Sequence, residues 1–179
     1  MGLIKQLARK KEAIVKDWFI KVVESYPAET AQFLRRQQDP FANPVGQTTH
    51  QSLLTLIDLL HQEIDPTIAR NALDPILRIR AVQDFTAARA VSFVFDLKKI
   101  IHTTFPVTQD NYKEMQTLDQ RIDSMGLIAF DVFMWCREKI YEIKSNELKE
   151  RTFKAFAKAG LIKESSEDGP AESDGDSKV

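Results

Sequence analysis

The chain has 179 residues, of which 43% are hydrophobic and 28% charged, the composition of a single soluble domain. Its 25 Lys and Arg residues nearly balance 26 Asp and Glu residues, which argues against a general nucleic-acid-binding protein, since those carry a clustered basic excess. The single cysteine, Cys136, excludes an internal disulfide and a cysteine-rich metal site. No apolar run suits a transmembrane segment or a signal peptide, so we expect a cytoplasmic location.

Apolar residues recur at intervals of three and four residues through most of the chain, which predicts an all-α fold. The first helix is expected from about Leu3 to Ser25. Tyr26-Pro27 follows it, and a residue before proline is disfavoured in a helix. A short second helix is expected over about 28–36.

A capping side chain followed by proline opens each of the next two helices, because a proline at the first helical position loses no hydrogen bond. The two pairs are Asn43-Pro44 and Asp65-Pro66. We expect these helices to end near residues 63 and 82. Pro75 lies inside the second of them, where we expect a kink or a break.

Thr86 is expected to cap a fifth helix that runs to about residue 103. Its apolar residues occupy more than one face, so we expect it to be the most buried helix. Four phenylalanines of this helix and the next could line an apolar ligand pocket, although we favour plain core packing for them: Phe93, Phe95, Phe130 and Phe133.

The last helix is expected to start at Thr108 or Asp110. Its apolar residues have a heptad-like spacing that predicts a dimer seam. The seam residues are Met115, Leu118, Ile122, Met125 and Ala129. Over residues 111–143 the helix would measure about 50 Å, whereas a small domain is about 30 Å across. We therefore expect part of it to pack on something outside its domain; the alternative is a break near Gly126.

The chain is expected to have three parts. Residues 1–145 form the helical domain, and residues 146–163 form a basic amphipathic extension that is either a final packed helix or a docking element. Residues 164–179 contain six acids and one base with almost no apolar side chains, so we expect a disordered acidic tail.

No pattern of catalytic residues stands out, so we expect no enzymatic activity, no cofactor and no metal. The histidines lack metal-ligand spacing, the glycines are isolated, and Cys136 has no obvious base beside it. His102, near the end of an apolar helix, could be a haem ligand. We favour a histidine that is stabilised by the helix C-terminus.

The run RIRAVQDF at residues 78–85 is the most informative segment. Arg78 and Arg80 flank an apolar position close to a helix junction. The planar fork of arginine can bind carbonyls at a helix C-terminus or pair with Asp74 or Asp84. We favour an interhelical clamp; the alternative is a site for an anion or a partner.

This run, with Ala90-Val91-Ser92-Phe93 after it, resembles the signature of the RsbRD N-terminal domain family, the sensor half of RsbT co-antagonist proteins in bacterial stressosomes. The turn DPFANPVG at residues 39–46 adds support. The resemblance covers roughly residues 8–143. The residues taken as its interaction or structural signature are Trp18, Asp39, Asn43, Arg78, Arg80, Gln83 and Asp84.

The resemblance implies a non-haem, globin-like bundle of about six helices with a long C-terminal helix, and dimerisation through the last helices. Full-length relatives continue into a STAS domain with phosphorylatable Ser or Thr residues. Here only the amphipathic segment and the acidic tail follow Ile143, so the resemblance does not carry the phosphorelay and kinase-binding roles to this chain.

Three functional hypotheses follow. The first is a non-enzymatic signalling or interaction module that works as a homodimer. The second is an accessory subunit that docks through its basic extension onto a membrane-associated redox or respiratory complex. The third is a globin-like sensor of haem or a small molecule.

Overall fold

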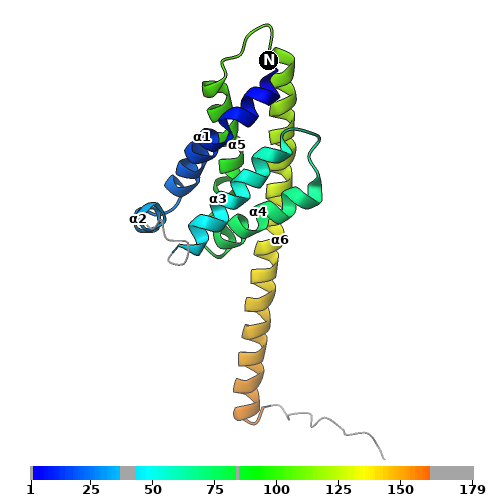
Figure 1. Ribbon diagram of the computed structural model, residues 1–179. Coiled ribbons are helices and arrows are strands. Elements are labelled where there is room, and N and C mark those ends of the chain that lie inside the picture. The colour runs from blue at the N-terminus through cyan, green and yellow to red at the C-terminus, as the bar shows by residue number, and fades with distance from the viewer. Residues whose placement is uncertain (1, 37–42, 84, 162–179) are drawn as a thin grey trace, which may run out of the picture. The chain divides into compact units, whose positions relative to one another are not determined.

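The computed structural model describes residues 2–36, 43–83 and 85–161, and these form six α-helices and no strand (Figure 1). The predicted all-α class and the long last helix are confirmed. The helices are α1 (Leu3–Glu24), α2 (Ala28–Arg36), α3 (Pro44–Leu59), α4 (Pro66–Val82), α5 (Ala87–Thr104) and α6 (Tyr112–Lys158). The predicted acidic tail, 164–179, lies outside the described residues.

The predicted caps are confirmed at three helix starts. The Asn43 side chain accepts a hydrogen bond of 2.8 Å from the backbone N–H of Gly46. The Asp65 carboxylate accepts two, including one of 2.8 Å from Thr67, and the Thr86 hydroxyl caps α5 at 3.3 Å. These side chains satisfy backbone donors that the first helical turn leaves without a partner, so they determine where α3, α4 and α5 begin.

The expected end of α3 near residue 63 is wrong, and so is a break at Pro75, one of the two outcomes expected there. α3 ends at Leu59 rather than near residue 63, because the next backbone N–H groups bond three residues back, which tightens the chain into a turn. α4 runs through Pro75 without a break. Leu73, Ile76 and Leu77 around this proline are fully buried, and their packing outweighs the one hydrogen bond that proline removes.

The long last helix is also continuous, so the alternative of a break near Gly126 is wrong. Phe95 of α5 lies against Gly126, and a side chain at that position would overlap its ring. Glycine at this position therefore permits the close approach of α5 to α6 and does not mark a turn.

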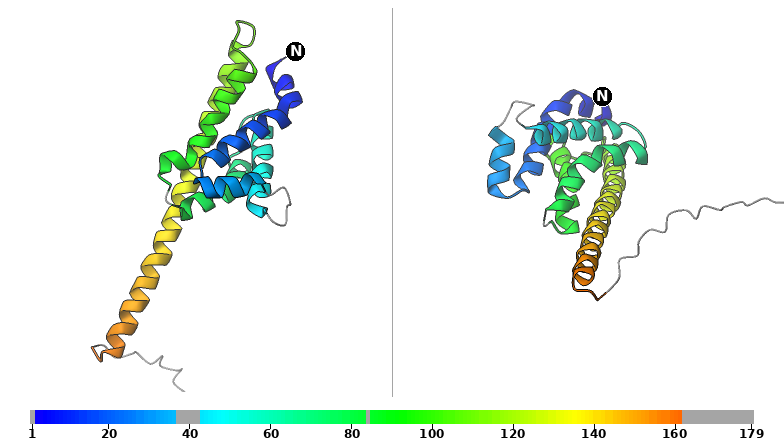
Figure 2. Two further views of the ribbon diagram at one scale, coloured as in Figure 1. Left: turned by 90° about the vertical axis from the view of Figure 1, so that its left-hand side faces the viewer. Right: turned by 90° about the horizontal axis from the view of Figure 1, so that it is seen from below.

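The chain divides into two compact units, residues 1–140 and residues 141–179. In the first unit α1 packs on α3 and α5, and α3 lies beside α4 (Figure 2). The largest buried side chain is Trp18, whose indole N–H donates to the carbonyl of Phe93 at 2.6 Å and so joins α1 to α5. In the second unit the C-terminal part of α6 has no buried residue as far as Leu161.

Candidate functional site

Arg80 of α4 is the most unusual residue of the first unit, since its side chain is 0% exposed. Its guanidinium donates to the carbonyl of Ala90 at 2.9 Å and to that of Val22 at 3.3 Å. It also donates to the hydroxyl of Ser25 at 2.7 Å. The fork thus reaches the C-terminal end of α1 and the first turns of α5, and these contacts are those of the interhelical clamp that we favoured.

Three aromatic rings surround the same guanidinium. Its central carbon lies 5.1 Å from the ring centroids of Tyr26 and Phe85 and 4.7 Å from that of Phe93. Burial lowers the pKa of Arg80, although an arginine stays charged at any physiological pH. The cation–π contacts and hydrogen bonds replace part of the water that the charge has lost, while the Arg80 Nε–H has no hydrogen-bond partner among the described residues.

Arg78, two residues earlier, lies on the surface. It forms a two-pronged ion pair with Asp74 of the same helix, with contacts of 2.8 to 3.2 Å. Gln83 is the C-terminal cap residue of α4, and its buried side-chain oxygen has no hydrogen-bond partner among the described residues. Two further signature residues, Asp39 and Asp84, lie outside the described residues.

The five predicted dimer-seam residues face the core of their own chain. Each of them is at most 2% exposed: Met115, Leu118, Ile122, Met125 and Ala129. Their side chains are not available to a second copy in this structure, so the assignment of a dimer to this seam is corrected. The heptad-like spacing reflects packing of α6 on its own unit, and a dimer, which stays a prediction, needs another face of the helix.

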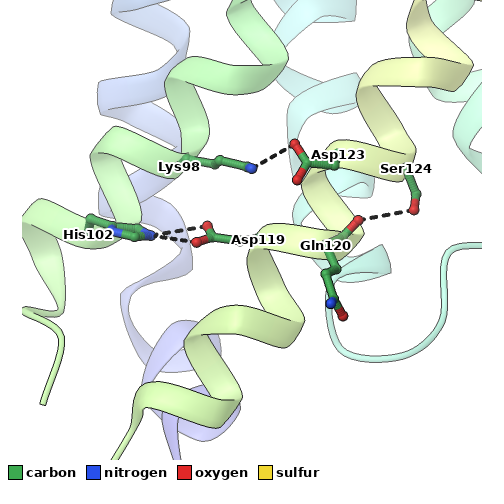
Figure 3. Close-up of polar contacts among 6 residues, drawn as sticks. All are labelled: Lys98, His102, Asp119, Gln120, Asp123 and Ser124. Atoms are coloured by element: carbon green, nitrogen blue, oxygen red, sulfur yellow. Dashed lines mark hydrogen bonds and ion pairs between the residues drawn. The ribbon is translucent and has the colours of Figure 1, made fainter. Parts of the chain in front are cut away.

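Polar side chains join α5 to α6 beside this seam (Figure 3). Lys98 pairs with Asp123 at 2.6 Å, and one ring nitrogen of His102 lies 3.1 Å from both carboxylate oxygens of Asp119. These partly exposed pairs orient the two helices, but such pairs add little stability. His102 therefore has a protein partner, Asp119, which the sequence did not predict.

The outward side of α6 carries large apolar residues. Leu127 is 70% exposed, and Phe130 and Met134 are exposed as well. In the second unit Tyr141 and Leu148 are also exposed. We call these five residues the outer stripe; in the sequence they are 3, 4, 7 and 7 residues apart, the spacing of one face of a helix. We missed this stripe because the buried seam shows the same spacing more completely.

A hollow of about 410 Å³ lies between α4 and α6 in the first unit. Its lining residues are Arg70, Asn71, Asp74, Arg78, Val132 and Trp135. Neither Arg70 nor Trp135 was predicted to belong to a site. A signal existed, because Trp135 directly precedes the core residue Cys136 and therefore lies off the core-facing side of α6.

The four phenylalanines proposed for a ligand pocket lie in different environments. Phe93 and Phe133 are buried, whereas Phe95 and Phe130 are exposed, so the four do not line one enclosed cavity. Within the described ranges, no three His, Cys, Asp or Glu residues come together in a way that could hold a metal ion. No helix in that part of the chain has the length and apolarity for a membrane crossing.

Cys136 is buried in the core, and its burial raises the pKa of the thiol. A raised pKa suppresses the reactive thiolate. The side chain therefore behaves as a small apolar core residue, as we expected.

Comparison with known proteins identifies the family. The model of the RsbT co-antagonist protein rsbRD N-terminal domain matches residues 12–148, which is most of the chain. Neither the curated proteins nor the solved structures include a significant match. The family match agrees with the all-helical fold and with the RIRAVQDF run. This chain belongs to the RsbRD N-terminal domain family, a family of stressosome-related regulatory signalling domains.

Proposed function

We propose that this chain is a non-enzymatic signalling module that works as a homodimer, and that the outer stripe of α6 forms the dimer contact. Its membership of a regulatory domain family supports a role in signalling. The observation that carries the dimer is the exposure of the outer stripe. In the first unit, the opposite side of α6 is already buried in the core, so this side cannot serve a second copy.

The second unit strengthens this argument. Residues 141–158 continue α6 without a single buried side chain, and Leu148 is 67% exposed. A helical segment in water is stabilised mainly by burying one apolar face, because intrinsic helix propensity is weak. A second copy of the same segment supplies that cover, as in a two-stranded coiled coil.

The proposal also gives α6 a role in transmission. The buried seam of α6 packs against the core of the first unit through residues such as Leu118. The outer stripe of the same helix contacts the second copy. A shift of the helix in the core therefore changes the contact between the two copies. In this proposal the signal travels as a movement of one packed helix.

Light scattering on the full chain at tens of micromolar tests the proposal. We expect a dimer for the natural sequence and a monomer for Leu148→Glu, because the new charge lies in the apolar contact. Asn146→Glu adds the same charge two residues away, off the stripe, and should remain dimeric. A natural chain that is monomeric at this concentration, or a Leu148→Glu variant that stays dimeric, contradicts the proposal.

A second candidate rests on the basic amphipathic extension. Its described part is helical to Lys158 and exposes Phe153 and Phe156 beside several lysines. This arrangement suits an accessory subunit that docks on an anionic surface of a membrane-associated complex. In that case the chain co-sediments with anionic but not with zwitterionic phospholipid vesicles, and deletion of residues 147–179 abolishes the co-sedimentation. Equal sedimentation with both vesicles, or with neither, rejects this candidate.

A further inference from the structure

The hollow between α4 and α6 has the size of a small-molecule site. Its volume of about 410 Å³ lies within the range of roughly 300–1,000 Å³ that ligand pockets occupy. Helical residues alone line it, from Arg70, Asn71, Asp74 and Arg78 on α4 and from Val132 and Trp135 on α6. Side chains on rigid helices hold their positions better than side chains on loops, which favours a preformed site.

The charges of the hollow leave one cation uncompensated. Arg78 is neutralised by its two-pronged pair with Asp74. Arg70 is exposed and has no hydrogen-bond or ion-pair partner among the described residues. Two arginines and one aspartate give the hollow a net charge of +1, and the open guanidinium fork matches the two oxygens of a carboxylate or phosphate.

Trp135 provides a partly exposed aromatic side chain. The chain has two tryptophans, and the other, Trp18, is fully buried with its N–H bonded to Phe93. Trp135 is 47% exposed although it is among the largest apolar side chains. One residue is about 100° around a helix, so Trp135 lies to the side of Met134 and off the outer stripe. A dimer through that stripe leaves the indole open.

Asn71 adds hydrogen-bonding groups. Pro75 has no N–H, so the carbonyl of Asn71, four residues earlier, lacks its usual helical donor. Asn71 also lines a neighbouring hollow of about 550 Å³ between α3 and α4, whose other lining includes the uncharged polar residues Gln47, Gln51 and Thr55. A ligand at Trp135 therefore has hydrogen-bonding groups beside it in addition to a cation and a ring.

We propose that the hollow between α4 and α6 binds a small aromatic anion, with a flat ring against Trp135 and a carboxylate or phosphate on Arg70. The ring contributes stacking and apolar burial, and the anion contributes a charge-assisted hydrogen bond. This inference goes beyond the proposed dimer, because it adds a small ligand that binds the first unit directly. Binding at Val132 and Trp135 contacts α6 itself.

The two indole N–H signals of the ¹⁵N-labelled full chain provide the test, because Trp135 reports on the hollow and Trp18 serves as an internal reference. The probes are AMP and 1-naphthoate, which carry a ring with a phosphate or with a carboxylate. Adenosine and inorganic phosphate each carry only one of the two features. The Trp135→Phe variant assigns the signals.

We expect AMP, 1-naphthoate or both to shift the Trp135 signal saturably and to leave the Trp18 signal unmoved. A response to AMP alone identifies phosphate as the anionic group, and a response to 1-naphthoate alone identifies carboxylate. Adenosine and phosphate should bind at least about tenfold more weakly, because each loses one contact. Arg70→Gln should weaken binding by about tenfold or more, whereas Arg9→Gln, on exposed α1 surface, should not.

Two results overturn the inference. One is an unmoved Trp135 signal with both AMP and 1-naphthoate at millimolar concentration. The other is equal binding to the natural chain and to Arg70→Gln, which would reduce the effect to unspecific contact with an exposed indole. The proposed dimer is tested separately by light scattering. Either of these two results would therefore contradict the ligand site without contradicting the dimer.

Discussion

The two parts of α6 both carry regularly spaced apolar residues, but these residues are buried in one part and exposed in the other. From Met115 to Cys136 the apolar residues at heptad-like spacing are buried by α6's neighbours in the first unit. From Tyr141 to Lys158 the helix continues, yet its apolar residues are exposed. The comparison shows that periodic apolar spacing identifies a face that packs without identifying what it packs against.

The buried charge of the first unit should give the largest effect. Arg80→Ala should lower the free energy of unfolding by about 3–5 kcal/mol, because it removes a buried group with several hydrogen bonds and leaves carbonyls without donors. Arg78→Ala, two residues away on the surface, should cost about 0.5 kcal/mol or less. Urea denaturation of the two variants measures the difference. Similar losses would show that Arg80 is not a clamp.

Two leucines test the contrast within α6 itself. Leu118 is fully buried, so Leu118→Ala should cost about 2–5 kcal/mol. Leu148→Ala should change the free energy of unfolding of the first unit by less than about 0.5 kcal/mol, since its side chain is exposed. Denaturation at submicromolar concentration keeps self-association out of the measurement. A large loss for Leu148→Ala there would mean that residues 141–158 stabilise the first unit.

Gly126 tests how closely α5 and α6 approach. Alanine is about 1 kcal/mol better than glycine in a helix, but its Cβ would meet the ring of Phe95. Gly126→Ala should therefore be close to neutral alone and stabilising by about 1 kcal/mol in a Phe95→Ala background. A double-mutant cycle by thermal denaturation measures this coupling. Additive effects would indicate that the ring moves away at no cost.

Cys136 should give the smallest effect. Burial raises the pKa of its thiol, with the charge of Asp74 acting in the same direction. Alkylation by iodoacetamide should be slow in the folded chain and should rise with pH later than in urea-unfolded chain. A raised folded pKa also means that the associated stability is present below the ordinary thiol pKa and is lost as pH rises above it. Equal alkylation profiles for folded and unfolded chain would contradict this burial effect.

Much of the fold could be predicted because its signals are local. Asn43, Asp65 and Thr86 bond to backbone groups two or three residues away, so their capping role depends on no distant partner. The predicted alternative of a break at Pro75 was wrong for the opposite reason. The local effect of this proline disfavours a helix, but burial of the residues around it depends on other helices, and that burial prevailed.

The candidate site could be predicted only in part. The RIRAVQDF run identified the family and drew attention to two arginines, but no local pattern distinguishes the buried Arg80 from the exposed Arg78. The hollow at Trp135 was missed, because it joins residues of α4 and α6 that lie about 60 positions apart in the chain.

The sequence by itself determined the helices, their starting points and the family, because capping, proline placement and apolar periodicity act within a few residues of each position. The tertiary structure alone decided which apolar side of α6 is buried and which of the two arginines, Arg78 or Arg80, is buried. It also decided that Arg70 and Trp135 line the same hollow. These features depend on contacts between distant helices, and the free energy of such contacts comes from burial that no single segment can provide.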